Sequence, residues 1–319
     1  MTLPTNPHLR GPLAGATIAS GDLDASLAFF RDELGMAVIA DVTPGAAAIE
    51  RSWGIAVPAP GRVLTLSGGS PEVGLLRLLD VSGEPAPPIR ERPSIVVPGP
   101  LAIDFGVEDL ASAHARLASL GYRFFSPPRD AHAVRICFAL APDRVMTALI
   151  QFPEGHPLRG RAFTGLINVA QIVESMSIEL PWYRECFAMH TSLDFVQEDN
   201  EETRRLSDAT QTPEGAELHL VNLVEREGVD GFQGGGTIEL IEPRIGAGPS
   251  VAASARPPRR GFFLTSIRVD DVDRVHAACA ARGREPLTAV LPADELTDAP
   301  HFVVCSPTGA LLEVRQGTP

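Results

Sequence analysis

Two of the eight histidines lie within predicted strands, where their side chains could reach a ligand. His219 lies in ELHLVN, and His301 begins HFVVC. Because histidine changes charge near neutral pH, either could act as a base or as a metal ligand. Each could equally be a hydrogen-bonded, half-buried strand residue. Trp182, next to Tyr183 near the start of a predicted helix, could pack against a sheet or line a binding site.

The basic residues restrict the chemistry further, because all 27 are arginine and the sequence contains no lysine. A lysine Schiff base and a P-loop lysine are therefore excluded. The four cysteines are scattered without a Cys-x-x-Cys pair. This spacing predicts reduced thiols rather than a disulfide framework or a zinc site.

Length and charge set the broad class of protein. A chain of 319 residues, 44% apolar and 21% charged, fits two folded domains of ordinary size. The formal net charge of −13 argues against a nucleic-acid partner or an anionic membrane. The sequence shows neither a targeting leader nor an apolar run of about 18 residues, so we expect a cytoplasmic location.

Four segments share one pattern, which is an apolar strand, a polar turn residue, an amphipathic helix, and a further strand. The polar turn residues are natural helix N-caps, because their side chains accept hydrogen bonds from free backbone amides. These four N-caps are Asp22, Asp109, Ser175 and Asp271. Three of the predicted helices end at the glycines Gly35, Gly121 and Gly283.

Further strand-like runs follow each helix, so each repeat is predicted to be a βαβββ module. We expect an α+β fold in which the four modules form two curled mixed-sheet domains. The first domain would span residues 1–155, with modules at about 11–82 and 96–153. The second would span residues 161–319, with modules at about 162–243 and 259–317.

This pattern resembles the vicinal oxygen chelate superfamily, which includes glyoxalases, bleomycin-resistance proteins and extradiol dioxygenases. The most specific segments are DLDASLAFFRDELGM after the first strand and SPTGALLEV near the end. The second is similar to the closing strand of the family, Asp-Pro-x-Gly-x-x-x-Glu. The resemblance implies that paired modules enclose a cleft, into which metal ligands project from first and last strands.

The resemblance places the first-strand ligand seven residues before each N-cap, at Gly15, Ala102, Asn168 and Leu264. The last-strand ligand positions are Arg77, Ala148, Glu239 and Glu313. We therefore expect no metal in the N-terminal domain, where these positions are apolar or cationic. In the C-terminal domain, Glu239 and Glu313 would face one cleft. There they could hold a single divalent metal with His219 or His301, or move a proton without one, unless each glutamate points to solvent or pairs with an arginine.

For function, the resemblance implies an isomerase or lyase that moves a proton next to a carbonyl group of a small, partly apolar substrate. Glu313 would be the base and Glu239 its partner, and the substrate would contact Asn168, His219, His301 and Trp182. A non-catalytic binding protein of the bleomycin-resistance type is the alternative. A second alternative is an atypical relative of the extradiol dioxygenases, in which His219 or His301 would have to replace the missing metal ligands. The sequence leaves a homodimer open.

Overall fold

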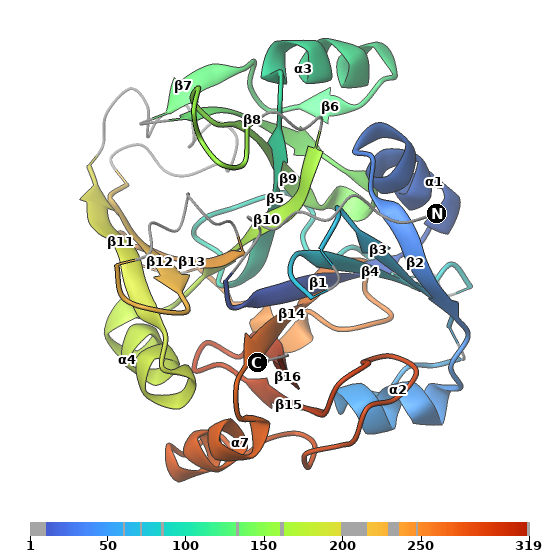
Figure 1. Cartoon of the computed structure of the whole chain (residues 1–319), viewed down its shortest axis with the longest axis vertical. Coiled ribbons are helices and arrows are strands. Elements are labelled where there is room, and N and C mark those ends of the chain that lie inside the picture. Colours follow the sequence, from blue (N-terminus) through green and yellow to red (C-terminus); the bar gives the residue numbers. More distant parts are fainter. Residues whose placement is uncertain are drawn as a thin grey trace.

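The computed structural model describes residues 11–317 except residues 60, 71, 84–85, 132–133, 160–162, 199–215, 229–235 and 247. Its strands form two mixed sheets (Figure 1). Sheet 1 has the order β15 (His301–Cys305), β16 (Leu311–Gln316), β14 (Gly261–Val269), β1 (Leu13–Ser20), β4 (Leu75–Asp80), β3 (Val63–Ser67), β2 (Ala37–Val42). Sheet 2 has the order β11 (His190–Gln197), β12 (Leu218–Val224), β13 (Thr237–Pro243), β10 (Phe163–Ile172), β5 (Gly99–Val107), β9 (Met146–Gln151), β8 (Val134–Leu140), β6 (Arg123–Phe124), with β7 (Arg129–Ala131) beside β8.

The two sheets confirm the expected α+β class, in which βαβββ modules pair into curled mixed sheets. The expected order of pairing is wrong. Sheet 1 joins the first and fourth repeats through the antiparallel pair β1 and β14, and sheet 2 joins the second and third through β5 and β10. The predicted division at 1–155 and 161–319 therefore cuts across both sheets. All four repeats offer a similar first strand, so their sequence patterns do not specify which first strands pair.

Four helical segments follow the first strands, one in each repeat. They are α1 (Leu23–Leu27) with its π-helical continuation η1 (Ala28–Glu33), α3 (Leu110–Ser119), α4 (Met176–Phe187) and α7 (Val272–Ala281). The predicted caps Asp22, Asp109 and Asp271 each accept a hydrogen bond from a helix amide. Ser175 occupies the fourth N-cap position, but its side chain makes no cap bond. Gly35, Gly121 and Gly283 follow their helices with φ of 70°, 89° and 72°, as a left-handed stop requires.

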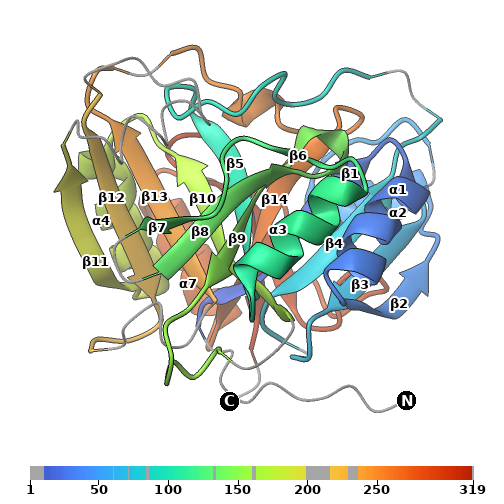
Figure 2. The same ribbon diagram turned by 90° about the horizontal axis from the view of Figure 1, so that it is seen from above.

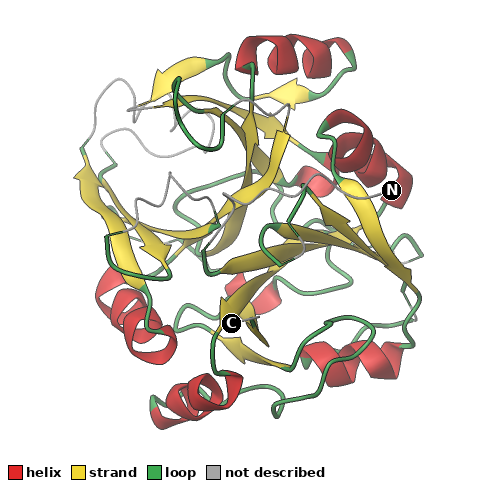
Figure 3. Cartoon of the chain, in the orientation of Figure 1, coloured by secondary structure: helices red, strands yellow, loops and turns green. Residues whose placement is uncertain are grey.

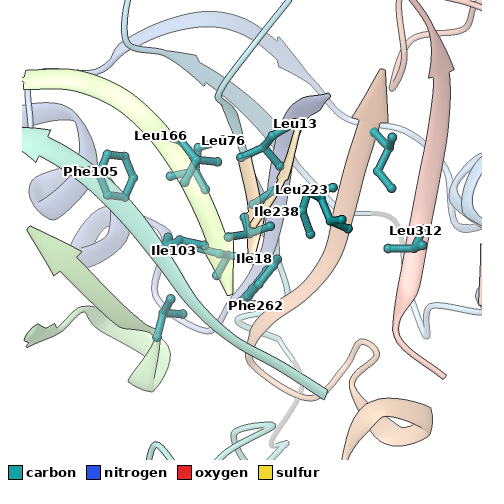
Figure 4. Close-up of a cluster of buried hydrophobic side chains, with 14 of the residues drawn as sticks. Leu13, Ile18, Leu76, Ile103, Phe105, Leu166, Leu223, Ile238, Phe262 and Leu312 are labelled. Carbon is teal, nitrogen blue, oxygen red and sulfur yellow. The ribbon is translucent and has the colours of Figure 1, made fainter. Parts of the chain in front are cut away.

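The two sheets pack against each other through a central core, and we call the face of each sheet that contacts this core its outer face and the opposite face its inner face. Figure 4 shows Ile18 and Phe262 of sheet 1 near Ile103 of sheet 2 in this core. The four repeat helices contribute their apolar stripes to the same core. Figure 2 shows α1 beside α3, where the ion pair between Glu33 and Arg116 joins the two helical segments. The inner face of each sheet therefore points away from this shared core (Figure 3).

The inner face of sheet 1 is filled by protein. Helix α2 (Ala46–Trp53), which the sequence analysis did not identify, places Ile49 and Trp53 in an apolar cluster with Phe263 of β14 and Leu296. Two short 3-10 turns, η2 (Pro142–Arg144) and η3 (Ala252–Ser254), complete the helical elements of the described chain. No helix in the described ranges is both long and apolar enough to cross a membrane.

Candidate functional site

Four last-strand residues occupy equivalent positions in the two sheets. Each is the cross-strand partner of the residue five positions before its repeat's N-cap. In sheet 1 these partners are Thr17 with Arg77 and Ser266 with Glu313. In sheet 2 they are Asp104 with Ala148 and Ala170 with Glu239. The register thus establishes that Glu239 and Glu313 are equivalent residues in different sheets.

In sheet 1, Arg77 and Glu313 form a buried bidentate ion pair. The guanidinium of Arg77 donates from Nη1 to Oε1 of Glu313 at 2.8 Å and from Nη2 to Oε2 at 2.5 Å. The side chain of Glu313 is 0% exposed and that of Arg77 is 7% exposed. Such a fork-to-fork arrangement fixes both side chains in one orientation.

Three further donors complete the surroundings of Glu313. Thr297 Oγ1 donates to Oε1 at 2.7 Å, Ser266 Oγ to Oε2 at 2.7 Å, and Trp53 Nε1 to Oε1 at 3.2 Å. Burial alone would raise the pKa of Glu313, but the Arg77 charge and these hydrogen bonds outweigh it and hold the pKa below its ordinary value. Glu313 is therefore ionised and saturated with donors, which disfavours its predicted role as a base.

In sheet 2 the equivalent positions leave a carboxylate without a cation. Ala148 takes the place of Arg77, and Ala170 takes the place of Ser266. Glu239 therefore lacks the guanidinium and the hydroxyl that neutralise Glu313. The charged group near it is instead the carboxyl of Asp104, from the second repeat.

Asp104 is held by a short polar chain across three strands. Its Oδ2 accepts a hydrogen bond from Asn168 Nδ2 at 2.8 Å, and Asn168 Oδ1 accepts one from Thr237 Oγ1 at 2.8 Å. Asp104 also accepts a hydrogen bond from the backbone N–H of Ala148. Asn168, predicted to bind substrate, thus uses both ends of its amide to link Asp104 to Thr237.

Both carboxyls of this site retain protons more strongly than usual. Burial raises the pKa of Asp104 to about 7, against the lowering effect of its hydrogen bonds. Burial and the neighbouring Asp104 raise the pKa of Glu239 to about 8. Two equivalent glutamates therefore have pKa values shifted in opposite directions, because Arg77 and hydrogen bonds offset the burial of Glu313, whereas burial and the charge of Asp104 both raise the pKa of Glu239.

The inner face of sheet 2 around Glu239 is apolar and is not covered by a described helix. Its buried cluster includes Ile241 beside Glu239, Leu220 on β12 and Ala102 on β5. Figure 1 shows α3 and α4 on the opposite, outer side of this sheet. Glu239 and Asn168 are only partly buried, unlike the fully buried Glu313. A partly exposed acid with a raised pKa on an apolar sheet face is a candidate functional group.

Neither sheet supplies the metal ligands that the resemblance implies. In sheet 1 the cation facing Glu313 is Arg77, and a Cβ on Gly15 would lie 2.4 Å from the carbonyl oxygen of Leu75. In sheet 2 both ends of the Asn168 amide are engaged. Within the described ranges, no group of three or more His, Cys, Asp or Glu side chains could hold a metal ion. These residues do not fit a metal centre of the family type.

The remaining predicted site residues do not reach the inner face of sheet 2. His219 lies on its outer face, where Nε2 is 2.8 Å from Asp194 Oδ1. His301 is fully buried in sheet 1, with Nε2 2.9 Å from Ser52 Oγ of α2. Trp182 is buried on α4 and lines a groove of about 420 Å³ between α4 and α7. Neither His219 nor His301 can therefore supply the metal ligand that the dioxygenase interpretation requires next to Glu239.

The expectation that the third and fourth repeats present Glu239 and Glu313 to one cleft is wrong. The sequence left open an arginine partner for Glu313, which the structure shows to be Arg77, but Asp104 was not predicted as a site residue. A signal for both was present, since each is a charged residue inside an otherwise apolar strand, in LAIDFGV and LLRLLD. Such residues are buried only when paired or when functional.

Comparisons with known proteins agree with this fold. Residues 12–149 match the model of the Glyoxalase/Bleomycin resistance protein/Dioxygenase superfamily. Glyoxalase I from Zea mays is similar in structure, with a TM-score of 0.65, 15% identity, and coverage of 96% of this chain and 92% of that chain. A structure titled "putative dioxygenase" from Bacillus subtilis subsp. subtilis str. 168 has a TM-score of 0.61, 12% identity, and coverage of 99% and 87%. No curated protein matches the chain in sequence.

The family model thus matches residues 12–149, and the four repeats together have the vicinal oxygen chelate fold of the glyoxalase I structure. At identities of 12% and 15% the structural likeness establishes the fold alone. The activity has to be argued from the side chains of this chain.

Proposed function

We propose that the inner face of sheet 2 binds a small, partly apolar carbonyl compound and that Glu239 transfers a proton next to its carbonyl group. The proposal keeps the isomerase- or lyase-type chemistry expected from the sequence but assigns it to Glu239 with Asp104, without Glu313. The observation that carries it is the position of Glu239, which is partly exposed, has no ion-pair partner among the described residues and lies near a second carboxyl. Two carboxyls with raised pKa values can hold one proton between them near neutral pH.

In the proposed step, ionised Glu239 takes the proton from the carbon next to the carbonyl group, which leaves an enolate. The carboxylic acid formed on Glu239 then exchanges its proton with water and returns a solvent proton to the same carbon, which regenerates the carboxylate and the carbonyl compound. Asp104 is held by Asn168 and acts on Glu239 through its charge, so it adds to the effect of burial in raising the pKa of the base.

We expect the protein to accelerate exchange of the α-protons of 2-hydroxyacetophenone in D2O, followed by proton NMR. Glu239→Gln should lower this rate by about 100-fold or more, because an amide cannot accept the proton. Glu242→Gln is the matched control, since Glu242 lies on the same strand but on its outer face, near His219. Unchanged exchange in Glu239→Gln, or no acceleration by the wild-type protein, would contradict the proposal.

The rate should also depend on pH through Glu239. Because the carboxylate form is the base, the exchange rate should rise with pH and level off above about 8, the pKa of Glu239. Asp104→Asn removes the neighbouring charge, so the midpoint of the rate profile should move to lower pH. A midpoint that is the same in both proteins would show that Asp104 does not act on the base.

The apolar inner face also favours the alternative of ligand binding without turnover. Under that alternative, wild-type protein and Glu239→Gln should bind 2-hydroxyacetophenone alike, and neither should exchange its α-protons.

A further inference from the structure

One buried polar atom on the inner face of sheet 2 has no hydrogen-bond partner in the described part of the chain. Asn222 on β12 is 3% exposed, and no donor among the described residues reaches its Oδ1. Asn222 is the direct cross-strand partner of Glu239. Cross-strand partners project from the same face of a sheet, so its amide lies beside the proposed base.

The alternation along β12 supports the same orientation. Leu218 and Leu220 belong to the inner-face cluster, whereas Val221 and Leu223 belong to the central core. Asn222 therefore continues the inward-facing row. A leucine at this position would continue that row and bury no orphan oxygen, so folding alone does not account for the amide.

A buried acceptor without a donor is destabilising by about 1–3 kcal/mol. A ligand that supplies the missing donor removes this penalty when it binds. Moreover, strands β5, β9, β10, β12 and β13 contain no arginine, and the face carries two carboxyls, Asp104 and Glu239. An anionic group near Glu239 would meet like charge there and no cation from these strands.

We infer that Asn222 is a specificity residue of this site, which selects an uncharged ligand whose hydroxyl or amide N–H donates to Asn222 Oδ1. The inference rests on the proposed location of the site and names the class of ligand that it takes. It does not require that the bound molecule react.

The test compares two neutral probes, 2-hydroxyacetophenone and acetophenone, which differ by one hydroxyl group. Their dissociation constants are measured by NMR titration, with mandelate as the anionic probe. The wild-type protein should bind the hydroxyl compound about tenfold more tightly than acetophenone, which corresponds to about 1.4 kcal/mol. Mandelate should bind more weakly than 2-hydroxyacetophenone.

Asn222→Leu should reduce the tenfold preference to about twofold or less. Its stability should equal or exceed that of the wild type, because the variant buries no orphan oxygen. Asn222→Ala should lose the same preference, which guards against a folding defect in one variant. His219→Gln is the control, since His219 lies on the same strand but on the outer face, and it should keep the preference.

Equal binding of the two neutral probes, an unchanged preference in Asn222→Leu, tighter binding of mandelate, or no binding of any probe would each overturn the inference. Dissociation constants can be measured whether or not the bound molecule reacts, so the binding test and the exchange assay can fail independently. A preference that depends on Asn222 without α-proton exchange would support the ligand class and contradict proton transfer. Proton exchange that depends on Glu239, with no effect of Asn222 on binding, would support proton transfer and contradict the ligand class.

Discussion

Arg77→Met is expected to lower the free energy of unfolding by about 3–5 kcal/mol, because it leaves Glu313 as a buried charge without its partner. The ion pair is bidentate and almost fully buried, so water cannot replace the guanidinium. Trp53 would lose its contact with the cation as well, since the Arg77 Cζ lies 5.2 Å from the indole centroid. Chemical denaturation at neutral pH measures this loss.

Two companion variants make the result specific. Arg77→Met combined with Glu313→Leu should recover part of the stability, because no charge is then left unpaired. Arg62→Met removes an exposed ion pair with Asp41 and should change the free energy of unfolding far less, because solvent screens exposed charges. A small effect of Arg77→Met, comparable with that of Arg62→Met, would mean that the pair is not the structural centre of sheet 1.

Stability should fall as pH rises from about 4 to about 8, as a result of the acids in sheet 2. The pKa of Glu239 rises from an ordinary 4.5 to about 8 on folding, and that of Asp104 rises from 3.8 to about 7. Between these values the folded protein retains protons that the unfolded chain has released. The favourable contribution of the protonated acids is therefore complete below about pH 4 and is lost as pH rises through 7 and 8.

Glu239→Gln should remove much of this dependence. We expect the variant to exceed the wild type by about 1–3 kcal/mol at pH 9 and to match it near pH 4, measured by denaturation at a series of pH values. Glu242→Gln on the outer face should leave the wild-type profile unchanged. A wild-type stability that rises between pH 5 and pH 8 would contradict the assigned pKa shifts. A gain in stability with a loss of activity is the expected signature of a functional buried acid.

The local elements of the fold followed from the sequence because their causes are local. Asp22, Asp109 and Asp271 cap helices through amides two or three residues away. The repeat pattern also identified Glu239 and Glu313 as equivalent positions, which the strand register confirms. Helix α2 was not predicted because it is short, although its buried residues Ile49, Ser52 and Trp53 follow helical spacing.

The pairing of the repeats became evident only in the folded chain. The strands β1 and β14 meet across almost the whole chain, and four similar repeats give no local signal that would choose this partner over another. That pairing places Arg77 against Glu313, whereas in sheet 2, where β5 pairs with β10, Ala148 occupies the position equivalent to Arg77. The sequence by itself determined which acids occupy the last strands. Their charge depends on neighbours from another repeat, so only the folded arrangement made one acid structural and left the other to bind or react.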